Sequence, residues 1–235
     1  MMIKIVRHGQ KHLALLTALV AMLVAQPLVG HRSVPGGAVA DAVLSAICLY
    51  MILIIFGQGW EQRAALALIL PAIASNFGVY VLPRGVHTVC EVAYHCFMVA
   101  FLGLTVAVIL RDLFAKSVIS GDDVIGAICG YLLVGLVWAN LYTLTYLLVP
   151  GTFAVSPDIA WRLGEWHQRR ALFDYLSFAT LMTLGYGDIT PIGPPAFTLT
   201  WLEVMFGQFY MAVVVAQLVG LKLAQALTRG GPEAK

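Results

Sequence analysis

The sequence predicts an all-α membrane protein with six transmembrane helices and a re-entrant helix and loop between the fifth and the sixth. Of its 235 residues, 60% are hydrophobic and only 11% are charged, whereas soluble domains have roughly 25% charged residues. Six apolar stretches reach the length of about 20 residues that a bilayer-spanning helix needs. A glycine-containing segment, residues 183–188 (Thr-Leu-Gly-Tyr-Gly-Asp), lies between the last two stretches.

The six predicted spans are separated by short polar segments. They cover residues 13–29, 39–57, 64–82, 92–110, 124–149 and 196–227. The first span has a second interpretation as a cleaved signal peptide, because Lys4, Arg7 and Lys11 precede its apolar core. No clear small-x-small cleavage site follows that core, so a retained transmembrane helix is the favoured interpretation.

The distribution of Lys and Arg predicts how the chain is oriented in the cell membrane. With the N-terminus inside, nine of the 14 Lys and Arg residues lie on the cytoplasmic side. Of the five outside, Arg162, Arg169 and Arg170 belong to the loop before residues 183–188. Because cytoplasmic loops carry the excess of positive charge, both termini are expected to be cytoplasmic. The net charge of +2 forms no basic patch, so no nucleic-acid partner is expected.

Residues 183–188 have a pattern that neither a helix nor a strand explains. Gly185 and Gly187 alternate with larger residues, so the chain can take positive φ at both, and successive carbonyls can then point to the same side. Irregular backbone at membrane depth is tolerated only where protein buries it or where it lines a watery cavity. A helix at 172–182, with Asp174 favourably near its positive dipole end, and an extended return segment therefore predict a re-entrant pore loop.

This segment resembles the selectivity filter of prokaryotic potassium channels, whose usual form is Thr-Val-Gly-Tyr-Gly. The resemblance covers residues 123–227, whereas the first four spans match in number alone. It implies that backbone carbonyls, together with the hydroxyl of the threonine, bind dehydrated K⁺. The implied ion-binding residues are Thr183, Leu184, Gly185, Tyr186 and Gly187. Leu184 replaces the usual Val, which changes packing behind the filter rather than the ligand set.

The same resemblance implies what surrounds the filter. Tyr186 is expected to point its ring away from the ion, and Asp188 is expected to support the filter by a hydrogen bond to Tyr175 of the pore helix. A closed ring of carbonyls needs four filter strands, so the partners expected are three further copies of the chain, the lipid bilayer and K⁺. K⁺ is the permeant ion, no cofactor is expected, and the chain is not expected to be an enzyme.

The spans and their orientation predict a division of the chain. Residues 1–12 are expected to be the cytoplasmic N-terminus, 13–110 a peripheral four-helix domain, 111–123 a cytoplasmic linker, 124–227 the pore domain and 228–235 a short cytoplasmic tail. Voltage-gated relatives carry Arg or Lys at every third position of the fourth span, because charge moving through the field drives gating. Residues 92–110 contain neither, and the first basic residue is Arg111. Steep voltage gating is therefore not expected. In the linker, Ser120 and Asp123 have the spacing of a helix-capping pair.

The last span is predicted to contain the gate. Gly207 lies where such channels carry a glycine that lets the inner helix bend, although close helix packing explains a membrane glycine equally well. If Gly207 is the hinge, helical spacing places Met211, Val215 and Val219 on the cavity wall, where apolar rings gate by dewetting. Glu203, one turn earlier, is expected to be paired behind the filter, since an unpaired charge in a membrane is costly.

His87, Glu91 and His95 form a cluster at helical spacing at the entrance to the fourth span. Such a set binds Zn²⁺ or Cu²⁺ or senses external pH. The favoured interpretation is structural, with His87 and Glu91 solvated and His95 hydrogen-bonded to a neighbouring helix. Three alternatives to a potassium-selective channel remain open: a weakly selective cation channel, a channel subunit regulated by a partner, and, from this cluster, an intramembrane metalloenzyme.

Overall fold

The computed structural model describes residues 11–29, 34–57 and 59–229. Its α-helices are α1 (Lys11–Val29), α2 (Val34–Ile55), α3 (Trp60–Val81), α4 (His87–Phe114), α5 (Gly121–Leu148), α6 (Trp166–Leu181) and α7 (Pro194–Arg229). The shorter elements are the 3₁₀ helices η1 (Arg84–Val86) and η2 (Ala160–Gly164) and the strands β1 (Phe153–Val155) and β2 (Ile189–Pro191). Each of the six predicted spans coincides with a helix, within a few residues at either end.

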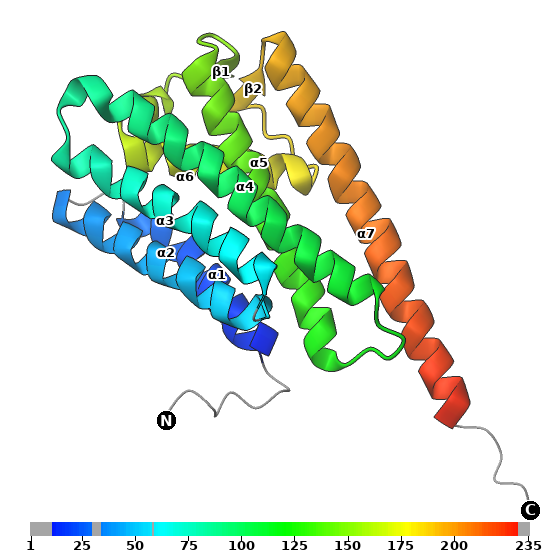
Figure 1. Ribbon diagram of the computed structural model, residues 1–235. Helices are drawn as coiled ribbons and strands as arrows, with labels where there is room; N and C mark the ends of the chain where they lie inside the picture. The colour runs from blue at the N-terminus through cyan, green and yellow to red at the C-terminus, as the bar shows by residue number, and fades with distance from the viewer. Residues whose placement is uncertain (1–10, 30–33, 58, 230–235) are drawn as a thin grey trace, which may run out of the picture.

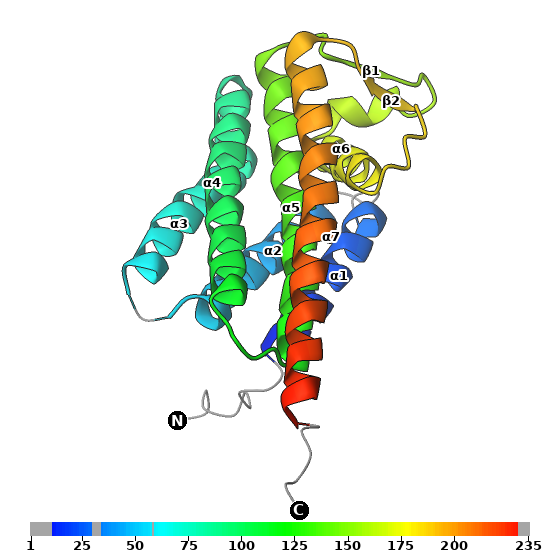
Figure 2. The same cartoon turned by 90° about the vertical axis from the view of Figure 1, so that its right-hand side faces the viewer.

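Helix α5 lies at the centre of the bundle and packs against α1, α4, α6 and α7. In Figure 1, α1 to α3 lie to the left of α5 and α7 runs along its right side; Figure 2, seen from that side, shows α7 in front. The short helix α6 lies against α5 and α7 near the end of the molecule that carries the two strands. The peripheral helices and the pore region therefore share one central helix.

Four helices in the described part of the chain are long and apolar enough to cross a membrane. They are Trp60–Val81, His87–Phe114, Gly121–Leu148 and Pro194–Leu227. The apolar portions of α1 and α2 are shorter, Lys11–Val24 and Asp41–Leu53. The chain is thus a mostly helical protein with several apolar helices of membrane-spanning length, as the composition predicts.

The connection between α4 and α5 ends in the predicted cap. The Ser120 hydroxyl and backbone amide both hydrogen-bond the Asp123 carboxylate, and the Asp123 amide donates back to the Ser120 hydroxyl. This reciprocal pair satisfies backbone donors that the first turn of a helix leaves unpaired. The cap prediction is confirmed, and it fixes where the central helix α5 begins.

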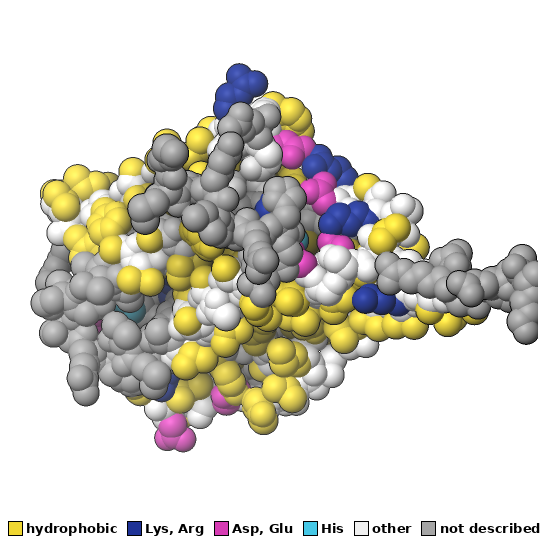
Figure 3. All heavy atoms as spheres, turned by 90° about the horizontal axis from the view of Figure 1, so that it is seen from below, with side chains coloured by type: hydrophobic (Ala, Val, Ile, Leu, Met, Phe, Trp, Pro, Cys, Tyr) yellow, Lys and Arg dark blue, Asp and Glu magenta, His cyan; other side chains and the backbone are white. Residues whose placement is uncertain are grey.

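The end of the molecule that carries this connection is charged. Seen from that end, acidic and basic side chains gather in one area and hydrophobic side chains occupy much of the flanks (Figure 3). A pocket of about 440 Å³ opens here, and its charged lining consists of Lys11, His12, Asp112, Lys116, Asp122 and Asp123. The His12 imidazole lies 2.8 Å from the Asp122 carboxylate and so joins α1 to α5. A charged end next to apolar flanks is what a helix bundle shows where it leaves a bilayer.

Helix α6 begins earlier than predicted, at Trp166 rather than at residue 172. Asp174 accordingly lies in the middle of the helix, two turns from the positive dipole end where it was expected. The polar residues 166–170 were predicted to be loop because they are too polar to span a membrane. Apart from the half-buried His167 they are buried instead, because neighbouring helices supply partners for them.

Candidate ion-conduction site

The segment after α6 has an alternating backbone. Thr183, Gly185 and Gly187 have φ of 59°, 58° and 78°, whereas Leu184 and Tyr186 between them are not in the positive-φ region. When residues with positive φ alternate with residues without it, successive carbonyls can face one side, which neither a regular helix nor a regular strand allows. Among the described residues Thr183 alone has positive φ without being glycine, a conformation that costs roughly 1–2 kcal/mol. Such local strain persists where the surroundings hold it and tends to mark functional sites.

Hydrogen bonds hold this segment at both ends. At the inner end, the amides of Thr183 and Leu184 donate to carbonyls in the last turn of α6, at 2.9 and 2.7 Å. At the outer end, the amide of Ser156 donates to the Asp188 carbonyl at 2.8 Å. Strand β2 starts directly after Asp188 and pairs antiparallel with β1. No pattern in the sequence predicts these two three-residue strands, which tie the outer end of the segment to the preceding loop.

Tyr175 and Asp188, the two residues predicted to support the filter, lie together at the outer end of the segment, and Tyr175 also contacts Tyr186. The rings of Tyr175 and Tyr186 are stacked, with centroids 6.3 Å apart and planes 8° from parallel. Burial and a hydrogen bond to Asp188 raise the pKa of the Tyr175 phenol to about 12. Tyr175 thereby contacts both the aromatic residue and the carboxylate of the predicted filter.

The filter segment is exposed in the single chain. Leu184 is 53% exposed and Tyr186 is 68% exposed, and the run from Met182 to Gly187 is exposed throughout. Helix α7 likewise has an exposed face, opposite the face that packs inside the chain. Its buried face includes Glu203, Gly207, Tyr210, Val214 and Leu218, and its exposed residues include the predicted cavity residues Met211, Val215 and Val219. One chain therefore leaves uncovered both the filter and the predicted gate.

Gly207 lies at a close approach between α7 and α6. A Cβ atom on Gly207 would lie 2.8 Å from the Leu181 side chain and 3.1 Å from its carbonyl oxygen. Gly207 thus allows the inner helix to touch the last residue of the pore helix, and α7 is one continuous helix through this position. This geometry supports the close-packing interpretation of Gly207, and the hinge stays a prediction.

Glu203, one turn before Gly207, is paired behind the pore helix as expected. It is 0% exposed, and its carboxyl group hydrogen-bonds Tyr142 of α5 and Ser177 of α6. Three helices therefore meet at one buried carboxyl group close to the filter.

The side chains of the histidine cluster have separate partners. His87 bonds the Leu82 carbonyl at 2.8 Å, Glu91 pairs with Arg169, and His95 bonds the Asn140 side chain at 2.7 Å. Within the described residues, no group of three His, Cys, Asp or Glu side chains is arranged to hold a metal ion. His95 bonds a neighbouring helix, as the structural interpretation of the cluster has it, whereas Glu91 is buried rather than solvated.

The N-terminal half of α6 is held by a buried polar cluster that sequence reasoning missed. Arg169 pairs with Glu91 of α4. Arg170 lies 3.3 Å from the Asp41 carboxylate of α2 and over the Tyr94 ring of α4, 4.9 Å from its centroid. The hydroxyl of Tyr80 in α3 contacts both Asp41 and His167, at 2.7 and 2.9 Å. Each of α2, α3 and α4 thus contacts the first turns of the pore helix.

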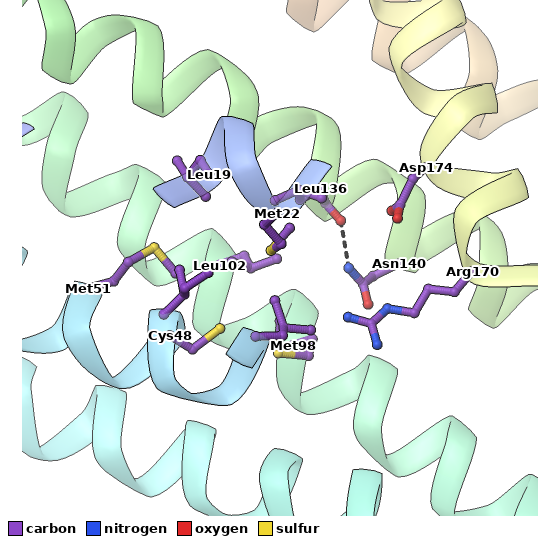
Figure 4. Close-up of a pocket in the computed structure, with 12 residues that line it drawn as sticks. Leu19, Met22, Cys48, Met51, Met98, Leu102, Leu136, Asn140, Arg170 and Asp174 are labelled. Carbon is purple, nitrogen blue, oxygen red and sulfur yellow. Dashed lines mark hydrogen bonds between the residues drawn. The ribbon is translucent and has the colours of Figure 1, made fainter. Parts of the chain in front are cut away.

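The Arg170 side chain also reaches into the interior of the bundle. A small cavity of about 20 Å³ lies between α1, α2, α4, α5 and α6, and Arg170, Asp174 and Asn140 form its polar end (Figure 4). The remainder of its lining is apolar, including Met98 and Cys48. A signal was present in the sequence, since Asp41 is an acidic residue near the start of an apolar span and demands a partner, but the sequence does not say which arginine provides it.

Comparisons with known proteins agree with the geometry of the pore region. The family described as Ion channel matches residues 141–221, from the last turns of α5 through most of α7. Protein LctB of Bacillus caldotenax is 30% identical over an alignment 131 positions long, which covers 51% of this chain and 93% of that protein. The chain belongs to the ion-channel family. The part that matches this family contains α6, the predicted filter segment and Gly207, whereas α1 to α4 lie outside it. No solved structure matches the chain.

Proposed function

We propose that four copies of this chain form a potassium-selective channel in the cell membrane, with six spans per chain. The observation that carries the proposal is the alternating positive φ at Thr183, Gly185 and Gly187 on a segment that one chain leaves exposed. A filter of backbone carbonyls replaces the hydration shell of K⁺. A single strand supplies carbonyls from one side only, so a closed ring needs symmetric copies around the ion.

Apolar surfaces support assembly in the membrane. The exposed side chains of α7 include Phe206, Phe209, Met211, Val215 and Val219, which suit lipid or other copies of the chain rather than water. In the proposed orientation both termini and the charged end in Figure 3 are cytoplasmic, and the filter opens outward.

Steep voltage gating is not part of this proposal. Within α4 the basic residue is Arg111 in the last turn, where it is exposed and pairs with Glu61 and Asp112. A charge moved across the field contributes about 2.3 kcal/mol per 100 mV, and no such charge lies in the middle of α4. We place the gate on the inner helix, where Met211, Val215 and Val219 of four copies form apolar rings below the filter.

Ion-substitution recordings from purified full-length protein in liposomes test the proposal. K⁺ and Rb⁺ should pass well ahead of Na⁺, and the reversal potential should follow the K⁺ gradient. A reversal potential indifferent to replacing K⁺ by Na⁺ would instead identify a weakly selective cation channel. The mass of the detergent-solubilised assembly provides the second measurement, because a stable complex of fewer than four chains contradicts the fourfold ring.

A further inference from the structure

Glu203 is a buried acidic residue to which the proposed conduction pathway assigns no role. It lies on the face of α7 that packs inside the chain, one turn before Gly207, and is 0% exposed. Tyr142 of α5 donates a hydrogen bond to one carboxyl oxygen, and the Ser177 hydroxyl of α6 contacts the other. None of the ion pairs formed by the described residues includes Glu203.

The contacts of the Ser177 hydroxyl indicate that the carboxyl group of Glu203 carries a proton. Its hydroxyl oxygen lies 2.7 Å from the Gly135 carbonyl oxygen as well as within hydrogen-bonding distance of Glu203. A serine hydroxyl has one proton to donate, and a backbone carbonyl can only accept. When the hydroxyl donates to Gly135, its contact with Glu203 is a hydrogen bond only if the carboxyl group of Glu203 carries the proton.

Burial leads to the same conclusion. Removing an ionised carboxylate from water costs several kcal/mol even after the protein relaxes, and here no cation of the described residues compensates for that cost. A neutral carboxylic acid avoids most of this cost and has both a donor and an acceptor. Those two functions match the two partners present, since Ser177 can accept and Tyr142 donates.

We propose that Glu203 is a protonated carboxylic acid that positions the pore helix α6 against α5 and α7 at Ser177, six residues before the filter segment begins. Ser177 and Leu181, the residues of α6 that Glu203 and Gly207 contact, lie one turn apart at the end of α6 that leads into the filter segment. Glu203 and Gly207 therefore form two successive contacts of α7 with α6. The protonation of Glu203 stands on its own contacts, whereas its effect on conduction rests on the proposed channel function.

Infrared difference spectroscopy on the reconstituted full-length protein tests the protonation. Parent minus Glu203→Gln should show the loss of a carbonyl stretch of a protonated carboxylic acid, with no loss in the carboxylate bands. The matched control is Glu165→Gln, because Glu165 is exposed at the N-cap of α6 and should lose carboxylate bands. Loss of carboxylate bands in Glu203→Gln overturns the proposal, even if the protein conducts no ions.

Ion flux tests the positioning role separately. Glu203→Gln keeps one donor and one acceptor without a charge, so its K⁺ flux and K⁺/Na⁺ selectivity should stay within about twofold of the parent, a difference below 1 kcal/mol. Glu203→Leu removes both hydrogen bonds and should reduce selective flux by about tenfold or more. Equal losses in the Gln and Leu variants overturn the positioning role. If the Leu variant fails to assemble, the Gln variant and the infrared result still decide the question.

Discussion

The two ends of α6 differ in how far the rest of the same chain covers them. At the N-terminal end, Arg169 and Arg170 are buried and have acidic partners on α4 and α2 of the same chain. At the C-terminal end, the segment after Leu181 is exposed over Met182 to Gly187. Partners within one chain therefore hold the N-terminal end of α6, whereas the segment after its C-terminal end is left uncovered, as the proposed assembly of four copies requires.

The chemistry of the N-terminal end explains why the peripheral helices are needed. The start of a helix carries partial positive charge, so two arginines in the first turns of α6 are unfavourable by themselves. Asp41 and Glu91 provide the opposite charge, and both are buried. The peripheral helices therefore supply counter-charges to the pore helix, even though α4 has no arginine series to move in an electric field.

The largest expected effect is at the exposed end. Gly187→Ala should abolish selective K⁺ flux, because the added Cβ disfavours φ of 78° in the filter. Gly151→Ala is a matched control, since Gly151 has φ of 79° in the outer loop and a Cβ there would meet nothing within 4 Å. Both variants should assemble, but only Gly187→Ala should lose flux in liposomes. Equal loss in both would mean that general backbone strain, not the filter, limits conduction.

The exposed face of α7 is expected to give the next largest effect. Val215→Asn and Val219→Asn should each raise basal K⁺ flux, because polar rings keep water in a pore that apolar rings empty. Val89→Asn, on an exposed position of α4, serves as the control for adding an amide to a membrane helix. If neither α7 variant leaks more than the parent, the gate does not lie on this face.

Removing one member of the buried pair Arg170–Asp41 tests the N-terminal end of α6. Arg170→Met should destabilise the protein by about 3 kcal/mol or more, because it leaves Asp41 buried beside an apolar side chain. The double variant Arg170→Met with Asp41→Asn should recover much of that loss in chemical unfolding. Arg111→Met is the control at an exposed pair and should change stability little. If the Arg170→Met variant is as stable as the parent, the ion pair with Asp41 does not stabilise the N-terminal end of α6.

Gly207→Ala tests how closely α7 must approach the pore helix. The added methyl group would lie 2.8 Å from Leu181, and overpacking of this kind costs roughly 1–3 kcal/mol. Gly220→Ala in the same helix meets nothing within 4 Å and should stabilise by about 0.5–1 kcal/mol. Unfolding of the assembled protein measures both. A destabilised Gly207→Ala supports close packing, whereas lost gating at unchanged stability supports the hinge.

The smallest expected effect is a dependence of stability on pH that arises at the buried N-terminal end of α6. Burial lowers the pKa of His167 below its usual 6.5, and this outweighs the opposing effect of Asp41; Arg170 and Glu165 also act on His167. The unfolded chain therefore binds more protons than the folded one as the pH falls below about 6.5, so stability decreases on acidification, by at most about 1.4 kcal/mol per pH unit. His167→Gln should flatten this part of the stability–pH curve. An unchanged curve would assign the dependence to other groups.

Much of the fold was predictable because membrane helices have a strong local signal. The apolar stretches located the helices, and Ser120 and Asp123 correctly marked the start of α5. The start of α6 was misplaced because residues 166–170 are polar, and their burial depends on Asp41 and Glu91, which lie far away in sequence. The pairing of Arg170 with Asp41 joins residues 129 positions apart, a separation over which local patterns carry no information.

The sequence by itself determined the helices and the filter segment, since length, hydropathy and the two glycines act locally on the backbone. Only the tertiary structure decided which polar groups meet. It placed Glu91 on Arg169 rather than beside His87 and His95 in one site, and it brought Glu203 to Tyr142 and Ser177. The physical reason is that a buried polar group must find a partner, and the packing of the helices determines which partner is within reach.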